Sequence, residues 1–93
     1  MHVVIVGCGR SGSALATRLD AGDATVSVID HDTETRRHLP APFRGSFVLG
    51  DALRKAVLDE AGIGRADAFD AVSSNDNLNI VAARVARDVF HVP

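Results

Sequence analysis

Three glycines near the start of the chain are spaced so that they could hold a phosphate group. Gly7, Gly9 and Gly12 form the pattern G-x-G-x-x-G, directly after a run of β-branched residues. In this pattern the first glycine permits a sharp turn, the second lets a pyrophosphate approach the backbone, and the third lets a helix pack closely on a strand. Free N–H groups at the start of that helix then face the phosphates. The pattern therefore predicts a nucleotide-binding turn.

An acidic residue at the end of the next apolar run could bind the ribose of the same nucleotide. Asp30 follows Gly12 by eighteen residues and comes directly after Val28 and Ile29. A carboxylate at this place accepts hydrogen bonds from both ribose hydroxyls of an adenosine. It repels a 2′-phosphate, so we expect NAD(H) or a plain adenosine nucleotide, ATP or ADP, and not NADP(H). The alternative is a glycine turn with a structural role alone.

Strands and helices alternate along the chain and would position these residues. Strands are expected at residues 2–6, 25–30, 46–49 and 68–72, and helices at residues 10–21, 33–38, 53–60 and 77–89. Such alternation indicates right-handed crossovers and a parallel sheet. We predict an α/β, Rossmann-like fold of about four strands in the order 3-2-1-4, with helices on both faces. The ligand then lies over the carboxyl ends of the strands. Four polar segments would meet there: Gly7–Gly12, Asp30–Asp32, Gly50–Asp51 and Ser73–Asp76.

Two of these helices have apolar positions that predict which face packs on the sheet. In the helix at 10–21 the apolar positions are Ala14, Leu15 and Leu19, and the outward positions are Thr17, Arg18 and Asp20. In the helix at 77–89 an apolar stripe is formed by Leu78, Val81, Ala82, Val85 and Val89. Spacing of this kind is typical of a helix face that covers a core.

Length and composition restrict the class of protein. The 93 residues suffice for one domain, residues 1–93, which is about half of a complete dinucleotide fold. The net charge is −2 and no basic cluster occurs, so nucleic acid is not an expected partner. The single cysteine excludes an intrachain disulfide and suits a reducing cytosol. The four histidines share no metal-ligand spacing.

The strand at 68–72 would lie at an edge of the sheet, where a fifth strand ordinarily covers it. Residues 91–93 read as the approach to such a strand. An apolar edge without a neighbour invites pairing. We expect either that this sequence is the N-terminal part of a longer protein, the reading we favour, or that a partner pairs along that edge.

Motifs beyond the glycines resemble one family, the RCK or KTN domain of the TrkA N-terminal type, which regulates potassium channels and transporters. The matching segments cover nearly the whole chain in order: Gly7–Gly12, Val28–Asp32, Gly50–Ala52, Leu58–Ile63, Ala66–Ala68 and Ala71–Asn79. The resemblance implies a cytoplasmic domain, or one at the inner face of the cell membrane, that binds NAD(H) or ATP/ADP. It implies control of potassium transport through a channel or transporter membrane subunit, and a homodimer or higher oligomer.

The resemblance assigns roles to four charged residues. Arg10 would reach the ligand phosphates, and its alternative role is a solvated arginine at a helix start. Asp30 would hold the adenosine ribose. Asp32 would contact a ribose or base, or be a solvated turn acid. Asp51 would lie beside the adenine and accept from its exocyclic amine, and it can also cap the helix at 53–60.

Residues after the strand at 68–72 receive roles in the same way. Ser73 and Asn75 would border the phosphate and the distal sugar, or cap the last helix. Asn79 would be structural and bond neighbouring loops across the crevice. Asn75 stands where an acid is common in the family, so the site is less acidic than in many relatives. The full predicted cofactor site is Gly7, Gly9, Arg10, Ser11, Gly12, Asp30, His31, Asp32, Asp51, Ala52, Ser73, Ser74 and Asn75.

Two other functions compete with a regulatory domain. One is the cofactor-binding half of an NAD-dependent dehydrogenase, which needs a proton donor or acceptor beside the nicotinamide. The chain has no tyrosine, its one lysine is Lys55, and no residues are left for a substrate domain. The other is an assembly domain with an empty site. We expect no enzyme here, and Cys8 is expected to be a loop side chain and not a nucleophile.

Overall fold

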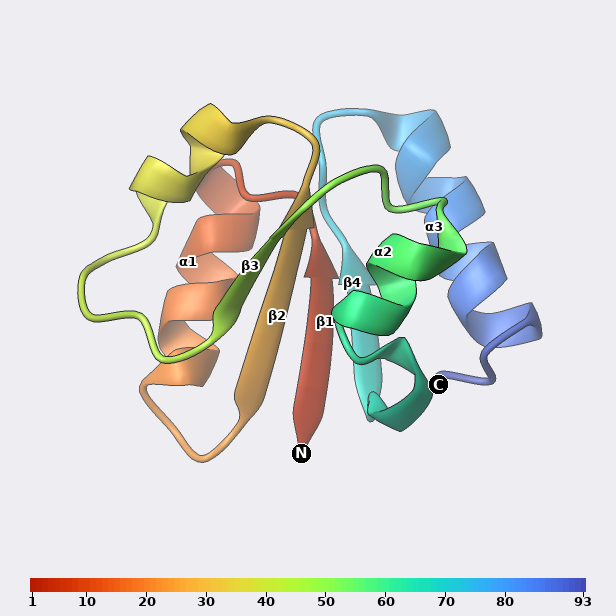
Figure 1. Cartoon of the computed structure of the whole chain (residues 1–93), viewed down its shortest axis with the longest axis horizontal. Helices are drawn as coiled ribbons and strands as arrows, with labels where there is room; N and C mark the ends of the chain where they lie inside the picture. Colours follow the sequence, from red (N-terminus) through yellow and green to blue (C-terminus); the bar gives the residue numbers. More distant parts are fainter.

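Four parallel strands form the sheet in the order β3-β2-β1-β4, as predicted. The computed structural model describes all 93 residues (Figure 1). The elements are β1 (His2–Val6), α1 (Arg10–Asp20), β2 (Thr25–Asp30), η1 (Thr33–His38), β3 (Ser46–Leu49), α2 (Lys55–Glu60), η2 (Ile63–Arg65), β4 (Ala68–Ala71) and α3 (Asp76–Asp88). None of the helices has the length and apolar character that a membrane crossing requires.

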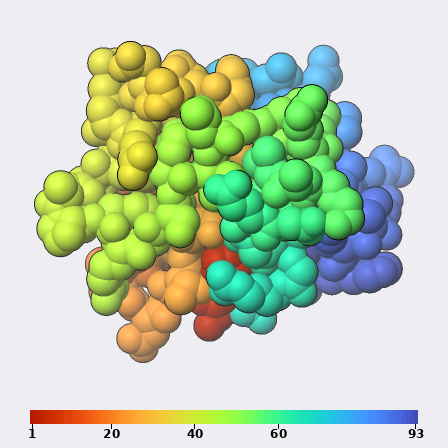
Figure 2. Space-filling view, viewed as in Figure 1, coloured from red at the N-terminus to blue at the C-terminus, as the bar shows by residue number.

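The sheet separates two layers of helices, so helices cover both faces as predicted. Side chains of β1 alternate between the two faces: Val4 and Val6 pack with α2, η2 and α3, whereas Val3 and Ile5 pack with α1 and the segment after η1. All five residues of β1 are buried. A central parallel strand covered on both faces is expected to be apolar throughout. Figures 1 and 2 show α2 and η2 in front of the sheet and α3 at the side that carries β4.

Several predicted boundaries and faces are wrong. The helix expected from Leu53 begins at Lys55, because residues 51–54 form a turn in which Arg54 N–H donates to the Asp51 carbonyl. The short helix predicted at 33–38 is present with those bounds, as a 3₁₀ helix, whereas the 3₁₀ helix η2 was not predicted. The last strand ends at Ala71, one residue early, and α3 begins one residue early, at Asp76. Residues 91–93, predicted to lead toward a further strand, have no regular secondary structure themselves.

The inward face of α1 differs from the predicted one. Ala16 is buried in the core and Ala14 is exposed. Asp20, expected to face outward, is 8% exposed, because its Oδ2 accepts the backbone N–H of Arg44 at 2.8 Å. The guanidinium of Arg44 also donates to the Asp20 and Gly22 carbonyls. A buried acid that is hydrogen-bonded in this way ties the end of α1 to the segment before β3.

The inward face of α3 is narrower than the predicted stripe. Ala82 and Ala86 are buried, but Val81 and Val89 are 46% and 62% exposed.

The strand β4 pairs only with β1, so its outer edge has no neighbour, as expected.

Candidate functional site

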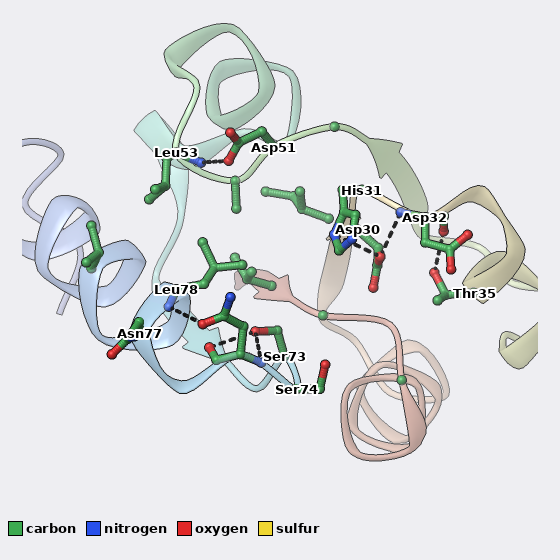
Figure 3. Close-up of a pocket in the computed structure, with 18 residues that line it drawn as sticks. Asp30, His31, Asp32, Thr35, Asp51, Leu53, Ser73, Ser74, Asn77 and Leu78 are labelled. Carbon is green, nitrogen blue, oxygen red and sulfur yellow. Dashed lines mark hydrogen bonds and ion pairs between the residues drawn. The ribbon is translucent and has the colours of Figure 1, made fainter.

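A cavity of about 840 Å³ lies at the carboxyl ends of the strands (Figure 3). Segments that follow all four strands line it, so the predicted convergence of polar strand ends is confirmed. The structure brings ten of the thirteen predicted site residues to its wall: Gly7, Gly9, Asp30, His31, Asp32, Asp51, Ala52, Ser73, Ser74 and Asn75. It does not place the other three, Arg10, Ser11 and Gly12, in the lining.

The three glycines are needed for different reasons. Gly7 has φ +107°, and a Cβ on it would lie 2.7 Å from the backbone of Ser73. A Cβ on Gly12 would collide with the Gly7 carbonyl oxygen. Both positions therefore need glycine for the fold itself, because the loop, α1 and β4 pack closely there.

Gly9 has no such structural requirement. Its φ is −78°, and a Cβ built on it would meet nothing within 4 Å. The residue lines the cavity, so that Cβ would stand at the cavity wall. Glycine at this position leaves room for a group that approaches the backbone from the cavity, which is the role predicted for it.

The start of α1 carries unpaired N–H groups beside Gly9. Its N-cap has no side-chain hydrogen bond and its first turn has no acid. The first backbone bond of the helix is from Ser13 N–H to the Gly9 carbonyl, and no protein atom accepts from the N–H groups of residues 9–12. Such a helix end, with the positive end of its dipole, favours an anion.

The start of α3 differs from this. Asn75 caps it, with its Oδ1 accepting Leu78 N–H at 3.0 Å, and Asp76 places an acid in the first turn. The cap pairs one free N–H group of α3, and the acid already compensates the positive end of its dipole. An anion in the cavity is therefore favoured at α1 and not at α3.

Asp30 stands opposite the glycine loop at the end of β2. Its Oδ2 accepts the Cys8 N–H at 2.8 Å and its Oδ1 accepts the Asp32 N–H at 2.9 Å. Its side chain is 11% exposed, and the ring of the exposed His31 lies 3.8 Å away. Each carboxylate oxygen has a further lone pair. The side chain is thus held in place and can still accept two hydroxyl groups.

Two other acids in the wall have turn roles. Asp32 is the N-cap of η1, with its Oδ1 accepting Glu34 N–H at 2.9 Å. Asp51 accepts Leu53 N–H at 2.9 Å, which bends the chain before α2 (Figure 3). The turn role that was the alternative for Asp32 is therefore present, whereas Asp51 does not cap α2, whose N-cap is Arg54 without a side-chain hydrogen bond. Each has a second carboxylate oxygen for a ligand.

Asn79 binds Ser73 through three hydrogen bonds. Its Oδ1 lies 2.5 Å from the Ser73 hydroxyl and accepts the Ser73 N–H at 3.0 Å, while its amide donates to the Ser73 carbonyl at 2.9 Å. Asn79 is thus structural as predicted, but it braces one loop and does not bridge the crevice. The helix cap is Asn75 alone, and the Ser73 hydroxyl is occupied within this loop.

Sequence reasoning missed an apolar part of the wall. Leu53 from the turn after β3 and Leu78 and Val81 from α3 line the cavity. Leu53 was expected to lie in a helix, and Leu78 and Val81 in an apolar stripe that covers the core. Their spacing therefore gave no sign that they line a cavity. Thr35 and Asn77 also line the cavity, and nothing in the pattern distinguished them from other polar loop residues.

Cys8 lies in the glycine loop with its side chain buried. Burial raises the pKa of the thiol, and the charge of Asp30 raises it further, against a smaller opposite effect of the hydrogen bond to the Thr35 carbonyl. A thiol that resists ionisation is a poor nucleophile. No group of three or more His, Cys, Asp or Glu side chains is placed to hold a metal ion.

Comparison with known proteins decides the family. The model of the TrkA-N domain matches residues 3–93. The chain belongs to the TrkA-N domain family. The resemblance inferred from the glycine turn and the later motifs is therefore confirmed.

Relatives with this domain are potassium uptake proteins by name. The chain is 54% identical over 92 residues to the Trk system potassium uptake protein TrkA of Streptomyces coelicolor, covering 99% of this chain and 41% of that protein. It is 34% identical over 87 residues to a TrkA homolog of Pyrococcus abyssi, covering 94% and 38%. The TrkA-N chain thus spans less than half the length of these relatives. Their names are those of an uptake system and not of an enzyme.

A solved structure supports the fold. The Shewanella denitrificans Kef C-terminal domain, described in an AMP-bound form, superposes with a TM-score of 0.77 at 22% identity, covering 99% of this chain and 55% of that chain. At this identity the likeness concerns the fold alone.

Proposed function

We propose that this TrkA-N domain is a nucleotide sensor that binds NAD(H) or ATP/ADP in the crevice and regulates potassium transport. The observation that carries the proposal is that one cavity wall contains both Gly9, at the unpaired and positive start of α1, and the fixed carboxylate of Asp30. Phosphates would lie at the N–H groups of residues 9–12, and Asp30 would accept the ribose hydroxyls.

The wall suggests how the rest of a nucleotide would lie. Leu53, Leu78 and Val81 offer apolar contact to a flat ring, and Asp51 offers an acceptor to an exocyclic amine. The remaining predicted site residues would border the ligand, and Arg10 would reach its phosphates from the exposed side of α1.

We further propose that the domain works within a longer cytoplasmic protein, at the inner face of the membrane, as a homodimer or higher oligomer. Its partner would be the membrane subunit of a potassium channel or transporter. The relatives' names and their greater length support this. A ligand changes transport only if it binds two states of the assembly unequally.

Calorimetric titration of the chain with NADH, NAD⁺, ATP, ADP and NADPH tests the proposal. We expect binding of at least one ligand without a 2′-phosphate, and exclusion of NADPH by the charge of Asp30. The ranking among the ligands distinguishes a redox sensor from an energy sensor. A folded chain that binds none of them would contradict the proposal, and it would favour the assembly domain with an empty site.

A further inference from the structure

The ring of His38 contacts the glycine loop from η1 and is not part of the cavity wall. His38 ends η1, the yellow segment beside the loop between β1 and α1 in Figure 1. Its Nδ1 lies 2.8 Å from the carbonyl oxygen of Cys8. A carbonyl oxygen only accepts, so the ring nitrogen is the donor. The Cys8 thiol donates to the Thr35 carbonyl at 3.4 Å, which makes a second contact between η1 and the loop.

This contact fixes the direction of one peptide unit. The Cys8–Gly9 peptide is trans, and in a planar trans peptide the C=O and the N–H point in opposite directions. The Cys8 carbonyl points to His38, so the Gly9 N–H points away from η1. Gly9 lines the cavity and no protein atom accepts its N–H. The hydrogen bond from His38 therefore keeps the free N–H of Gly9 pointing away from η1. Gly9 itself is part of the cavity wall.

The loop has little else to hold this peptide. The preceding peptide is held by the bond from Cys8 N–H to Asp30, and the following segment by the bond from Ser13 N–H to the Gly9 carbonyl. Gly9 itself has no side chain and can adopt many backbone conformations. A donor that is already oriented costs less to use when a ligand arrives.

We propose that His38 is a positioning residue for phosphate binding, which acts through the Cys8 carbonyl to aim the Gly9 N–H at the ligand. The inference rests on the nucleotide-binding function proposed above. His38 does not line the cavity, so it acts without touching the ligand. Its effect is confined to ligands with a phosphate, because the group that it orients is a phosphate donor.

The test compares ATP and adenosine on variants of one residue. His38→Leu removes the donor, whereas His38→Asn is smaller but carries an amide nitrogen at the δ position that can replace Nδ1. Thr33→Ala is the matched control, since Thr33 is exposed on η1 and its side chain makes no hydrogen bond and does not line the cavity. Dissociation constants come from calorimetry, and the melting temperature of each variant shows that it is folded.

We expect His38→Leu to weaken ATP binding about threefold to tenfold, which is the effect of one net hydrogen bond. Adenosine affinity should be unchanged, and His38→Asn should regain most of the ATP affinity. Unchanged ATP affinity in His38→Leu, an equal loss for adenosine, or no recovery in His38→Asn would overturn the inference while the proposed function stands. If the wild-type chain binds no adenosine phosphate, the proposed function fails and the inference fails with it.

Discussion

The backbone N–H of Cys8 donates a 2.8 Å hydrogen bond to Oδ2 of Asp30, although 22 residues separate them. The bond ties the glycine loop after β1 to the end of β2. The second oxygen of the same carboxylate accepts the N–H of Asp32. One side chain therefore organises two sides of the crevice.

Asp30→Asn should reduce the affinity for every ligand that contains ribose, including adenosine. The amide loses the charge and one acceptor, and its NH₂ group would face backbone N–H donors. Hydrogen bonds to a charged group are worth about 1.5–3 kcal/mol each, so we expect a loss of about tenfold or more by calorimetry. Asp23→Asn, an exposed acid outside the cavity, is the control. Unchanged adenosine affinity in Asp30→Asn would show that the ribose lies elsewhere.

Gly9→Ala should weaken ATP binding without lowering the stability of the fold. The alanine Cβ meets no protein atom and the backbone φ is negative, so the melting temperature should stay the same or rise. ATP affinity should fall about tenfold or more, because the Cβ fills the space through which a phosphate reaches the N–H groups. Gly64→Ala controls for the substitution, since its Cβ also meets nothing and lies outside the cavity. A Gly9→Ala chain that binds ATP as well as wild type would rule out this approach of the phosphate.

Arg10→Ala tests a residue that the structure leaves exposed and outside the cavity wall. If its guanidinium reaches the phosphates, ATP affinity should fall about threefold to tenfold, while adenosine affinity stays constant. The loss should shrink at high salt, since exposed charges are screened. Arg18→Ala, at the other end of α1, should change neither affinity. Equal losses for ATP and adenosine would mean that Arg10 does not contact phosphate.

The Cys8 thiol should react slowly with iodoacetamide at pH 8 in the folded chain and rapidly in the unfolded one. Folding raises its pKa, so in the unfolded state the thiol ionises at lower pH, from about pH 8.5. Above that pH the unfolded state binds fewer protons, and the free energy of unfolding therefore falls as pH rises. Below it both states hold the proton and no such effect exists. The measurement is denaturant unfolding from pH 7 to 10, compared with Cys8→Ala. An equal pH dependence of the free energy of unfolding in the wild-type chain and in Cys8→Ala would contradict the raised pKa of Cys8.

Patterns with a regular period predicted the sheet well. The strand order, both helical layers and the convergence of Gly9, Asp30 and Asp51 at one edge follow from alternation and from the direction of parallel strands. The boundaries that failed depend on single side chains. Asp51 bends the chain so that α2 starts late, and Arg44 draws Asp20 into a buried contact that helical periodicity cannot show.

The missed part of the site has a related cause. Leu53 and Val81 are apolar and are spaced like core residues, and only the tertiary arrangement exposes them to the cavity. The contact from His38 to the Cys8 carbonyl joins residues 30 positions apart through one ring nitrogen. No local pattern encodes such a contact.

The most direct test of the central claim is to follow the backbone amide signals of the ¹⁵N-labelled chain by NMR while ATP or NADH is added. The account predicts that the signals of Gly9 to Gly12 and those of residues 30–32 move together, with one common dissociation constant. The Gly9 amide should show one of the largest changes, because no protein atom accepts its N–H. Shifts confined to other surfaces, or no shifts at millimolar ligand, would contradict the placement of a nucleotide in this crevice.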